Sequence, residues 1–211
     1  MKKNLLVLFT CTAVSYCAFS QENPINRNGF GIKGGVNATT VHTQDDTPVA
    51  FETDADYKVG YHVGIFAEVF VNDFKKIAVQ PELLYSLDGY KIKDYQSGNN
   101  NGELVYDLHT VNLPILLKYY FTPNFNIHLG PQATYQVCQS YKLDDNEISN
   151  TAFKRRINST NISVVAGLEV LLSEYIALGV RYNHGGKTLY KTRDAVDVTH
   201  RSFQLGVGIK F

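Results

Sequence analysis

The chain has 211 residues, of which 44% are hydrophobic, and its 20 basic and 20 acidic residues balance. This balance gives no electrostatic case for binding nucleic acid, and we expect none. After residue 20, no uncharged apolar run approaches the roughly 18 residues of a membrane helix, so any membrane span must be made of strands. A strand in a barrel wall needs apolar residues only at alternate positions, which suits a mean hydropathy of -0.17.

The first 20 residues have the pattern of a cleaved secretory signal. Two lysines precede an apolar run from Leu5 to Val14, and a small-x-small cleavage pattern ends at Ser20. We therefore expect residues 1–20 to be a signal peptide and residues 21–211 to form one domain. The alternative is that this segment is kept as a helical membrane anchor, but its apolar run is too short to span a bilayer.

Without the signal, the chain keeps 18 basic and 20 acidic residues and one cysteine, Cys138. One cysteine can form neither an intramolecular disulfide nor a thiolate metal site. The six histidines lack the paired spacing of a dedicated metal site. We therefore expect no metal and no cofactor, and stability must come from packing and backbone hydrogen bonds.

Eight segments alternate apolar and other residues with a period of two, which predicts β-strands. In chain order they are Phe30–Asn37, Lys58–Phe70, Ile77–Tyr90, Asp107–Phe121, Asn126–Tyr141, Thr160–Leu172, Tyr175–Tyr182 and Arg201–Phe211. Most are as long as the roughly 9 to 11 residues that a tilted strand needs to cross a bilayer.

The connections alternate in length. Short ones lie at Val71–Lys76, Thr122–Asn124 and Ser173–Glu174, and long polar ones at Ala38–Tyr57, Lys91–Tyr106, Lys142–Ser159 and Asn183–His200. This arrangement is typical of an outer-membrane barrel with periplasmic termini and extracellular long loops. We predict an all-β fold, an eight-stranded antiparallel up-and-down transmembrane β-barrel.

Each predicted strand has one apolar face and one mixed face that carries most of the glycines. An eight-stranded barrel has room for few large side chains inside, so we place the glycine-bearing faces in the lumen and the apolar faces against lipid. The lumen is then expected to hold a polar network that plugs it, made of Lys33, Glu68, Gln80, Glu82, Lys118, His128, Gln132, Glu169, Arg181, Gln204 and Lys210. The alternative is a soluble periplasmic barrel whose apolar faces enclose an apolar ligand.

Aromatic residues gather near both ends of the predicted strands, as in the interfacial girdles of membrane barrels. Those near the short turns are Phe70, Phe74, Tyr119, Phe121, Phe125, Tyr175 and Phe211. Those nearer the long loops are Tyr57, Tyr61, Tyr85, Tyr90, Tyr135, Tyr141, Tyr182 and Phe203.

Several stretches together resemble the PorT-like outer-membrane β-barrel proteins of Gram-negative bacteria. They are "GFGIKGGVN", "GYHVGIFAEVFV", "IAVQPELLYSLDGYK", "VNLPILLKYYF", "FNIHLGPQATY", "VVAGLEVLLSEYIALGVRYNHG" and "FQLGVGIKF". The resemblance covers nearly all of the expected mature chain. It implies an eight-stranded outer-membrane barrel, with Phe211 as the signal that the barrel-assembly machinery reads. It also implies a link to secretion of surface proteins, and it carries over no functional residue.

We predict no enzymatic activity, and a structural or interaction role through the long loops, in secretion or adhesion with a surface or secretion protein as partner. Outer-membrane lipid and lipopolysaccharide are further expected partners, the latter through the basic tip Lys154–Arg156. The alternative is a lipid-modifying enzyme at the outer rim. Its candidate residues are His184, His200, Ser202 and either Asp194 or Asp197, since a histidine must reach both a nucleophile and an acid.

Overall fold

The computed structural model describes residues 28–44, 56–71, 76–97, 100–143, 146–147, 160–187 and 197–211. These residues form nine strands: β1 (Gly29–Gln44), β2 (Asp56–Phe70), β3 (Ile77–Ser97), β4 (Asn100–Thr122), β5 (Phe125–Leu143), β6 (Asn146–Glu147), β7 (Thr160–Leu171), β8 (Ile176–Lys187) and β9 (Asp197–Lys210). Among the described residues, no helix has the length and apolar character to cross a membrane. The expected signal peptide, residues 1–20, lies outside the described residues.

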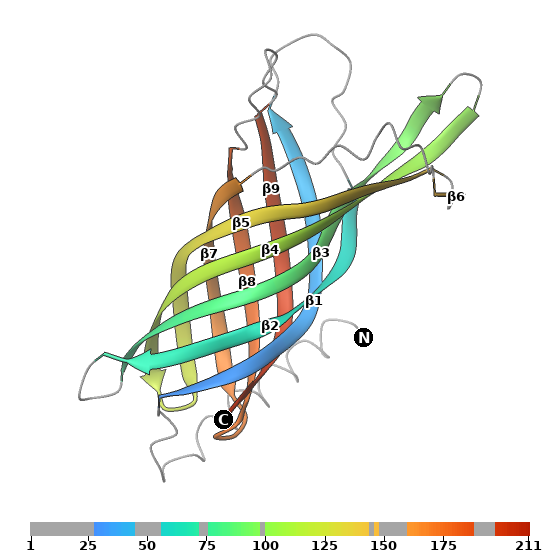
Figure 1. The fold of residues 1–211 in the computed structure, drawn as a ribbon. Helices are drawn as coiled ribbons and strands as arrows, with labels where there is room; N and C mark the ends of the chain where they lie inside the picture. Colours follow the sequence, from blue (N-terminus) through green and yellow to red (C-terminus); the bar gives the residue numbers. More distant parts are fainter. Residues whose placement is uncertain are drawn as a thin grey trace, which may run out of the picture.

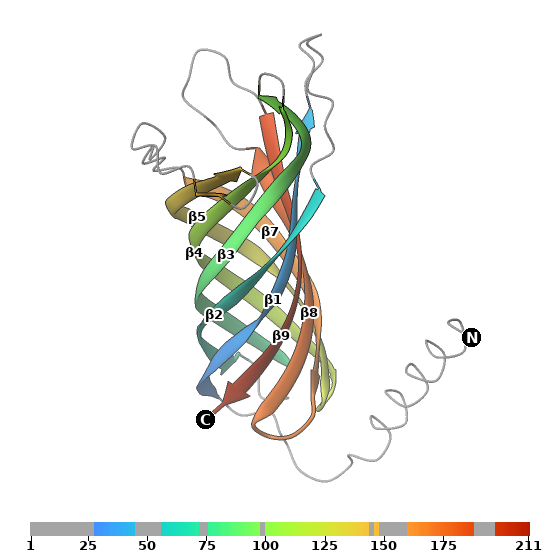
Figure 2. The same ribbon diagram turned by 90° about the vertical axis from the view of Figure 1, so that its right-hand side faces the viewer.

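Eight long strands close into a barrel (Figures 1 and 2). Their order is β4-β3-β2-β1-β9-β8-β7-β5, and pairing of β4 with β5 joins the two ends of the sheet. Every pair is antiparallel, and the two-residue β6 only extends the edge of β5. The predicted eight-stranded antiparallel barrel is therefore confirmed. Closure leaves no open sheet edge within the wall, as a bilayer requires.

The two rims of the barrel differ. The turns after β4 and β7 lie at one rim, which we call the short-turn rim, and the described chain also ends there at Phe211 (Figure 1). The β7–β8 turn is closed by backbone hydrogen bonds in which the amides of Leu172 and Ser173 donate to the carbonyl of Ile176. We call the opposite end, where the long connections were predicted, the long-loop rim.

Toward the long-loop rim the strands run further than predicted. The connection expected at Lys91–Tyr106 is mostly strand, because β3 and β4 stay paired as far as Ser97 and Asn100. This pair projects beyond the other strands in Figure 1. Alternation marks only the part of a strand with two unlike faces, whereas a backbone ladder continues through polar residues once two strands are aligned.

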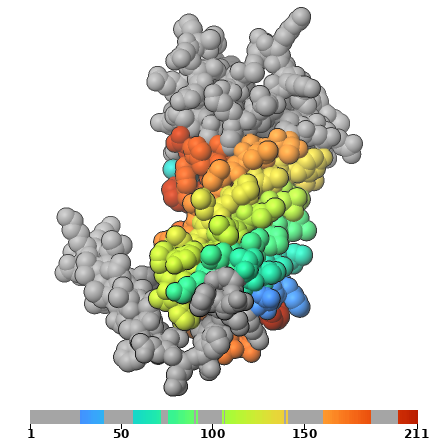
Figure 3. All heavy atoms as spheres, turned by 90° about the vertical axis from the view of Figure 1, so that its left-hand side faces the viewer, coloured from blue at the N-terminus to red at the C-terminus, as the bar shows by residue number. Residues whose placement is uncertain are grey.

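The outer face of the wall is apolar. Figure 3 shows one side of it, where the strands follow one another obliquely from teal β2 through green and yellow to orange. Exposed aliphatic side chains cover the wall, among them Ile32, Val36, Val63, Ile65, Leu113, Ile115, Leu117, Leu129, Ile162, Val164, Leu168, Leu178, Val180, Leu205 and Val207. The alternative of a barrel with inward apolar faces is therefore wrong, since such a surface needs lipid to cover it.

The aromatic bands are present in part. Tyr119, Phe121 and Tyr175 are exposed near the short-turn rim, and Tyr61 and Phe203 are exposed nearer the long-loop rim. Phe70 was wrongly placed in the first band. Its ring lies against that of Tyr120, a buried residue, at 5.3 Å between centroids. The last residues of β2 keep the inward alternation of Glu68, so position 70 faces the lumen.

Glycine makes room inside the barrel where two strands approach each other. At Gly130 of β5, an added Cβ would collide with the carbonyl oxygen of Ile115 on β4. The neighbouring Leu116 is fully buried. The absent side chain of Gly130 thus lets β5 approach β4, and it leaves lumenal space for the larger side chains that β4 turns inward.

Candidate functional site

The interior of the barrel is divided into three layers. At the short-turn rim, Ala78, Tyr120 and Leu171 form an apolar cluster with Phe70 and Ala177, which we call the apolar floor. Above it, buried charged side chains form an ionic layer. Toward the long-loop rim, hydroxyl and amide side chains line a small cavity, the polar cup. Period-two alternation places all three layers inside, because each contributing strand sends every second side chain inward.

One half of the ionic layer is centred on Glu82 of β3, whose side chain is 0% exposed. Arg181 of β8 binds it with two parallel hydrogen bonds, Nη1 to Oε2 at 2.7 Å and Nη2 to Oε1 at 2.6 Å. Lys33 Nζ of β1 donates to Oε1 at 3.0 Å, and Gln80 Nε2 donates to the same oxygen at 2.5 Å. The carboxylate therefore joins strands on different sides of the lumen through charge-assisted hydrogen bonds.

The other half is centred on Lys118 of β4, whose side chain is 2% exposed. Its Nζ donates to Glu169 Oε1 at 2.5 Å, to Gln80 Oε1 at 2.7 Å and to Glu68 Oε1 at 3.0 Å. These three acceptors match the three protons of an ammonium group. Glu68 also accepts hydrogen bonds from Tyr120 Oη at 2.5 Å and from Lys210 Nζ at 2.8 Å.

Gln80 connects the two halves, since its amide group donates to Glu82 and accepts from Lys118. Four cationic side chains thus meet three carboxylates in one continuous network. Asn126 Nδ2 of β5 donates to Glu169 Oε1 at 3.3 Å, so that each of the eight wall strands contributes a side chain. Buried charges in such a layer must be paired, because an unpaired charge away from water is strongly unfavourable.

A neutral network ties Asn112 and Thr134, which line the polar cup, to neighbouring side chains. Asn112 Nδ2 of β4 donates to Ser86 Oγ at 2.9 Å, and Asn112 Oδ1 accepts from Thr134 Oγ1 at 2.7 Å and from Gln132 Nε2 at 3.3 Å. On the β1 side, His62 Nδ1 and Asn37 Oδ1 are 2.5 Å apart. These groups hold the walls of the cup in place with hydrogen bonds that involve no charge.

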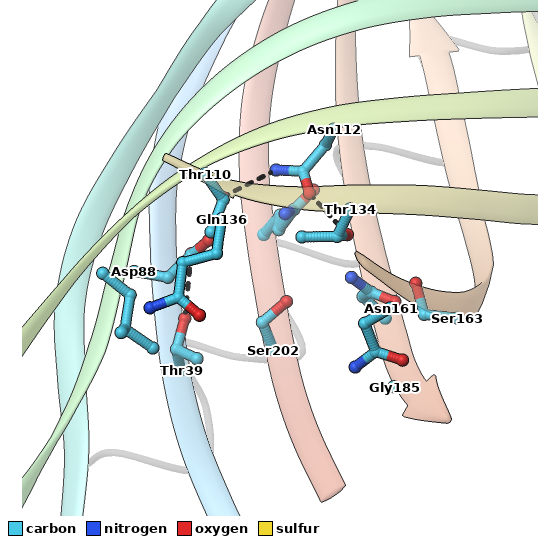
Figure 4. Close-up of a pocket in the computed structure, with 13 residues that line it drawn as sticks. Thr39, Asp88, Thr110, Asn112, Thr134, Gln136, Asn161, Ser163, Gly185 and Ser202 are labelled. Carbon is cyan, nitrogen blue, oxygen red and sulfur yellow. Dashed lines mark hydrogen bonds between the residues drawn. The ribbon is translucent and has the colours of Figure 1, made fainter. Parts of the chain in front are cut away.

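The polar cup has a volume of about 70 Å³ and is lined by side chains of seven strands. Figure 4 shows Thr39 and Asp88 on one side of it and Asn161 and Ser163 on the other, with Ser202 between them. Its lining is Thr39, Asp88, Leu108, Thr110, Asn112, Thr134, Gln136, Asn161, Ser163, Asn183, Gly185, Ser202 and Gln204.

The predicted lumenal residues are all buried, but the structure does not place them all in one network. The ionic layer brings together Lys33, Glu68, Gln80, Glu82, Lys118, Glu169, Arg181 and Lys210. Gln132 belongs instead to the neutral network, and Gln204 lines the cup. His128 lies beside Lys118 in the sheet, and neither ring nitrogen has a hydrogen-bond partner among the described residues.

The prediction missed several inward residues that the structure places in this site. Asn37, Asp88, Asn112 and Tyr120 all bond to the networks described above. Each lies an even number of positions from a predicted lumenal residue of its strand, as Asp88 does from Glu82, so both side chains face the same side of the wall. Alternation along each strand is therefore the signal that identifies them.

The candidates for a rim enzyme are only partly described. His184 is exposed on the outer face, where its Nδ1 lies 3.2 Å from Tyr182 Oη. Ser202 is buried inside, so these two side chains lie on opposite faces of the wall. The side chains of His200 and Asp197, and all of Asp194, lie outside what the structure describes.

Comparison with known proteins identifies the family. The sequence matches the outer membrane protein beta-barrel domain over residues 19–185. No curated protein sequence gives a significant match. Among solved structures, the attachment invasion locus protein Ail of Yersinia pestis is similar in fold, with 13% identity, a TM-score of 0.50, and coverage of 88% of this chain and 99% of that one.

The outer membrane protein OprG from Pseudomonas aeruginosa is also similar, with 16% identity, a TM-score of 0.50, and coverage of 88% of this chain and 97% of that one. At such low identity these structures support the fold alone. The match over residues 19–185 spans most of the chain and agrees with the closed barrel and its apolar outer wall. The protein therefore belongs to the outer membrane protein beta-barrel domain family and is a protein of the bacterial outer membrane.

Proposed function

We propose that this protein is a closed, non-conducting barrel that serves a structural or interaction role at its long-loop rim. The observation that supports this most directly is the ionic layer, in which buried side chains of all eight wall strands bond to one another across the lumen. The interior of an eight-stranded barrel is about filled by side chains, which leaves no continuous water-filled path.

We expect the purified protein to give no steady ion-conducting steps in a planar lipid bilayer. A double variant, Lys118→Ala with Glu169→Ala, removes one cation and one anion and so keeps the net charge of the layer. It also empties the space between β4 and β7, and we expect it to conduct. Folding of both proteins is checked by their different gel mobility before and after boiling. Steady conducting steps from the unaltered protein would disprove the proposal that the lumen is closed.

We further propose that the short-turn rim faces the periplasm and that the long-loop rim faces outward. The supporting observation is that the turns at one rim are short, whereas β3 and β4 project from the other rim. Outer-membrane barrels keep short turns on the periplasmic side and long loops outside. The projecting β3–β4 pair is then the part of the wall best placed to touch a partner.

Surface labelling tests this orientation. Thr160 and Glu174 are exposed residues near the two ends of β7, and each can be replaced by cysteine in a Cys138→Ser background. On intact cells, we expect a membrane-impermeant maleimide to label Thr160→Cys. Glu174→Cys should react only after the outer membrane is permeabilised. The reverse pattern of labelling would mean that the barrel is inserted the other way round.

The finer identity is also a proposal. We place the chain with the PorT-like proteins, and we propose that residues 1–20 are removed as a signal peptide on export. The barrel-assembly machinery would then insert the mature chain. Lipopolysaccharide and a surface or secretion protein are the proposed partners of the long-loop rim. We propose no catalytic role, because His184 and Ser202 lie on opposite faces of the wall.

A further inference from the structure

The polar cup has the chemistry of a site for a neutral, hydroxyl-rich ligand. Its lining consists mainly of alcohol and amide side chains, with Leu108 as an apolar member and Asp88 as its one charged member among the described residues. Alcohols and amides both donate and accept hydrogen bonds, so such a lining matches hydroxyl groups in either direction. No lysine or arginine lines the described cavity to attract an anion.

Asp88 does not act as a free charge in this cup. Its Oδ1 accepts hydrogen bonds from Asn37 Nδ2 at 3.0 Å and from Thr39 Oγ1 at 3.2 Å, and its Oδ2 accepts from Thr110 Oγ1 at 3.1 Å. One carboxylate held in this way is a poor basis for a calcium site, which usually has several. Within the described residues, no group of three or more metal-ligating side chains is present.

The opposite wall of the cup carries an acceptor without a protein partner. Asn183 Oδ1 is buried and has no hydrogen-bond partner among the described residues. Asn183 pairs with Ser202 across the β8–β9 ladder, and both line the cavity. A buried carbonyl oxygen without a partner is unfavourable, so the side-chain amide gains a hydrogen bond if it rotates this oxygen toward a donor inside the cup.

The size of the cup sets the size of the ligand. The cavity of about 70 Å³ has room for about five to seven waters, because each water needs roughly 10 to 15 Å³ of such space. Five waters fill roughly 150 Å³ of liquid, which is close to the volume of a single sugar ring. The ionic layer lies beneath the cup, so a molecule entering from the long-loop rim would bind without passing through.

We propose that the polar cup binds one unit of a neutral sugar. The amide of Asn183 rotates so that Oδ1 accepts a hydrogen bond from a sugar hydroxyl, Ser163 and Ser202 take part on the same wall, and Leu108 contacts an apolar face of the ring. This inference goes beyond the proposed function. It concerns the cup alone and holds whether or not the lumen conducts ions.

Titration of the full-length folded protein in detergent micelles tests the inference. Glucose, galactose, mannose and N-acetylglucosamine serve as neutral probes and glucuronate as a charged probe, with the amide signals of Ser163, Asn183 and Ser202 followed by nuclear magnetic resonance. We expect saturable shifts with at least one neutral sugar, with a dissociation constant on the order of 1 mM, as is typical of a ligand this small. Glucuronate should bind more weakly because its carboxylate meets no lysine or arginine in the described lining of the cup.

Two neighbouring variants supply the control. Asn183→Leu removes the unpartnered acceptor and fills the cup, and should weaken sugar binding by about tenfold or more. His184→Leu changes the next residue on the outer face and should leave binding unchanged. Both variants must keep the heat-dependent gel shift of a folded barrel.

Three results would overturn the proposal. The first is the absence of a saturable shift with any neutral sugar, which would mean that the cup holds water only. The second is an equal loss of sugar affinity in both variants. The third is binding of glucuronate as tight as that of the neutral sugars. The source of a bound sugar is tested with disaccharides that carry the best-binding sugar at their non-reducing end, whose affinity is compared with that of the single sugar. Tighter binding of the disaccharide supports a glycan at the cell surface as ligand, and exclusion of the disaccharide supports a free monosaccharide.

Discussion

Replacing Glu82 by alanine should destabilise the barrel more than any other single change in the ionic layer. The carboxylate is fully buried, and it is the acceptor for both guanidinium hydrogen bonds of Arg181 and for the ammonium group of Lys33. Its removal leaves two cations in the lumen without their anion. Breaking a buried ion pair from one side typically lowers the free energy of unfolding by about 3–5 kcal/mol.

The measurement is unfolding of the barrel in urea in the presence of lipid vesicles, followed by loss of the heat-dependent gel shift. The matched control is Glu174→Ala, which removes an exposed carboxylate from the β7–β8 turn and should change stability by less than about 0.5 kcal/mol. If Glu82→Ala behaved like this control, the lumen would have to contain enough water to solvate both cations.

A variant that replaces Lys33, Glu82 and Arg181 together separates the effect of unpaired charges from that of lost hydrogen bonds. With apolar side chains of similar volume, no charge is left unpaired, and such replacements are often neutral or stabilising. We expect this triple variant to be far more stable than Glu82→Ala. A triple variant as unstable as the single one would show that these hydrogen bonds themselves, and not the unpaired charges, govern stability.

The second large effect is expected on the outer face. Val180 of β8 is 51% exposed and lies between Leu168 of β7 and Leu205 of β9 in the middle of the apolar band. Val180→Arg should lower the free energy of unfolding in lipid by about 2–4 kcal/mol, because arginine at the bilayer midplane loses its hydration. The same unfolding measurement in vesicles applies.

Val71→Arg is the matched control for this effect. Val71 is exposed to a similar degree, 57%, but it follows the end of β2 at the short-turn rim. Near the membrane interface the penalty for arginine falls to about 0–1 kcal/mol. Equal effects of the two substitutions would contradict the proposed depth of the barrel in the bilayer, and a small effect at both sites would contradict lipid contact at Val180.

The two effects have a common origin in the alternation along each strand. A shift in strand register by one residue would turn Lys118 and Arg181 toward lipid and turn leucine and valine toward the lumen. Both changes are unfavourable, so the ionic layer and the apolar wall specify the same register. The charged residues thus contribute to a unique fold even where the net energy of each buried pair is small.

The sequence by itself determined which residues face lipid and which face the lumen. Side chains alternate with a period of two in any strand, so the faces of segments such as Ile176–Tyr182 can be assigned without knowing their partners. Glycine on the mixed faces then indicated which side is inside, since only a lumen requires small residues there. The eight-stranded barrel and its place among outer-membrane β-barrel proteins were predicted correctly.

Only the tertiary structure decided which lumenal residues meet. Lys210 reaches Glu68 across 142 positions of sequence and Arg181 reaches Glu82 across 99, whereas His128 finds no partner among the described residues. Such pairings depend on the stagger between strands and on which walls face each other once the sheet has closed, and neither is encoded in local alternation. For the same reason, the polar cup emerges only when side chains of seven strands come together at one height in the barrel.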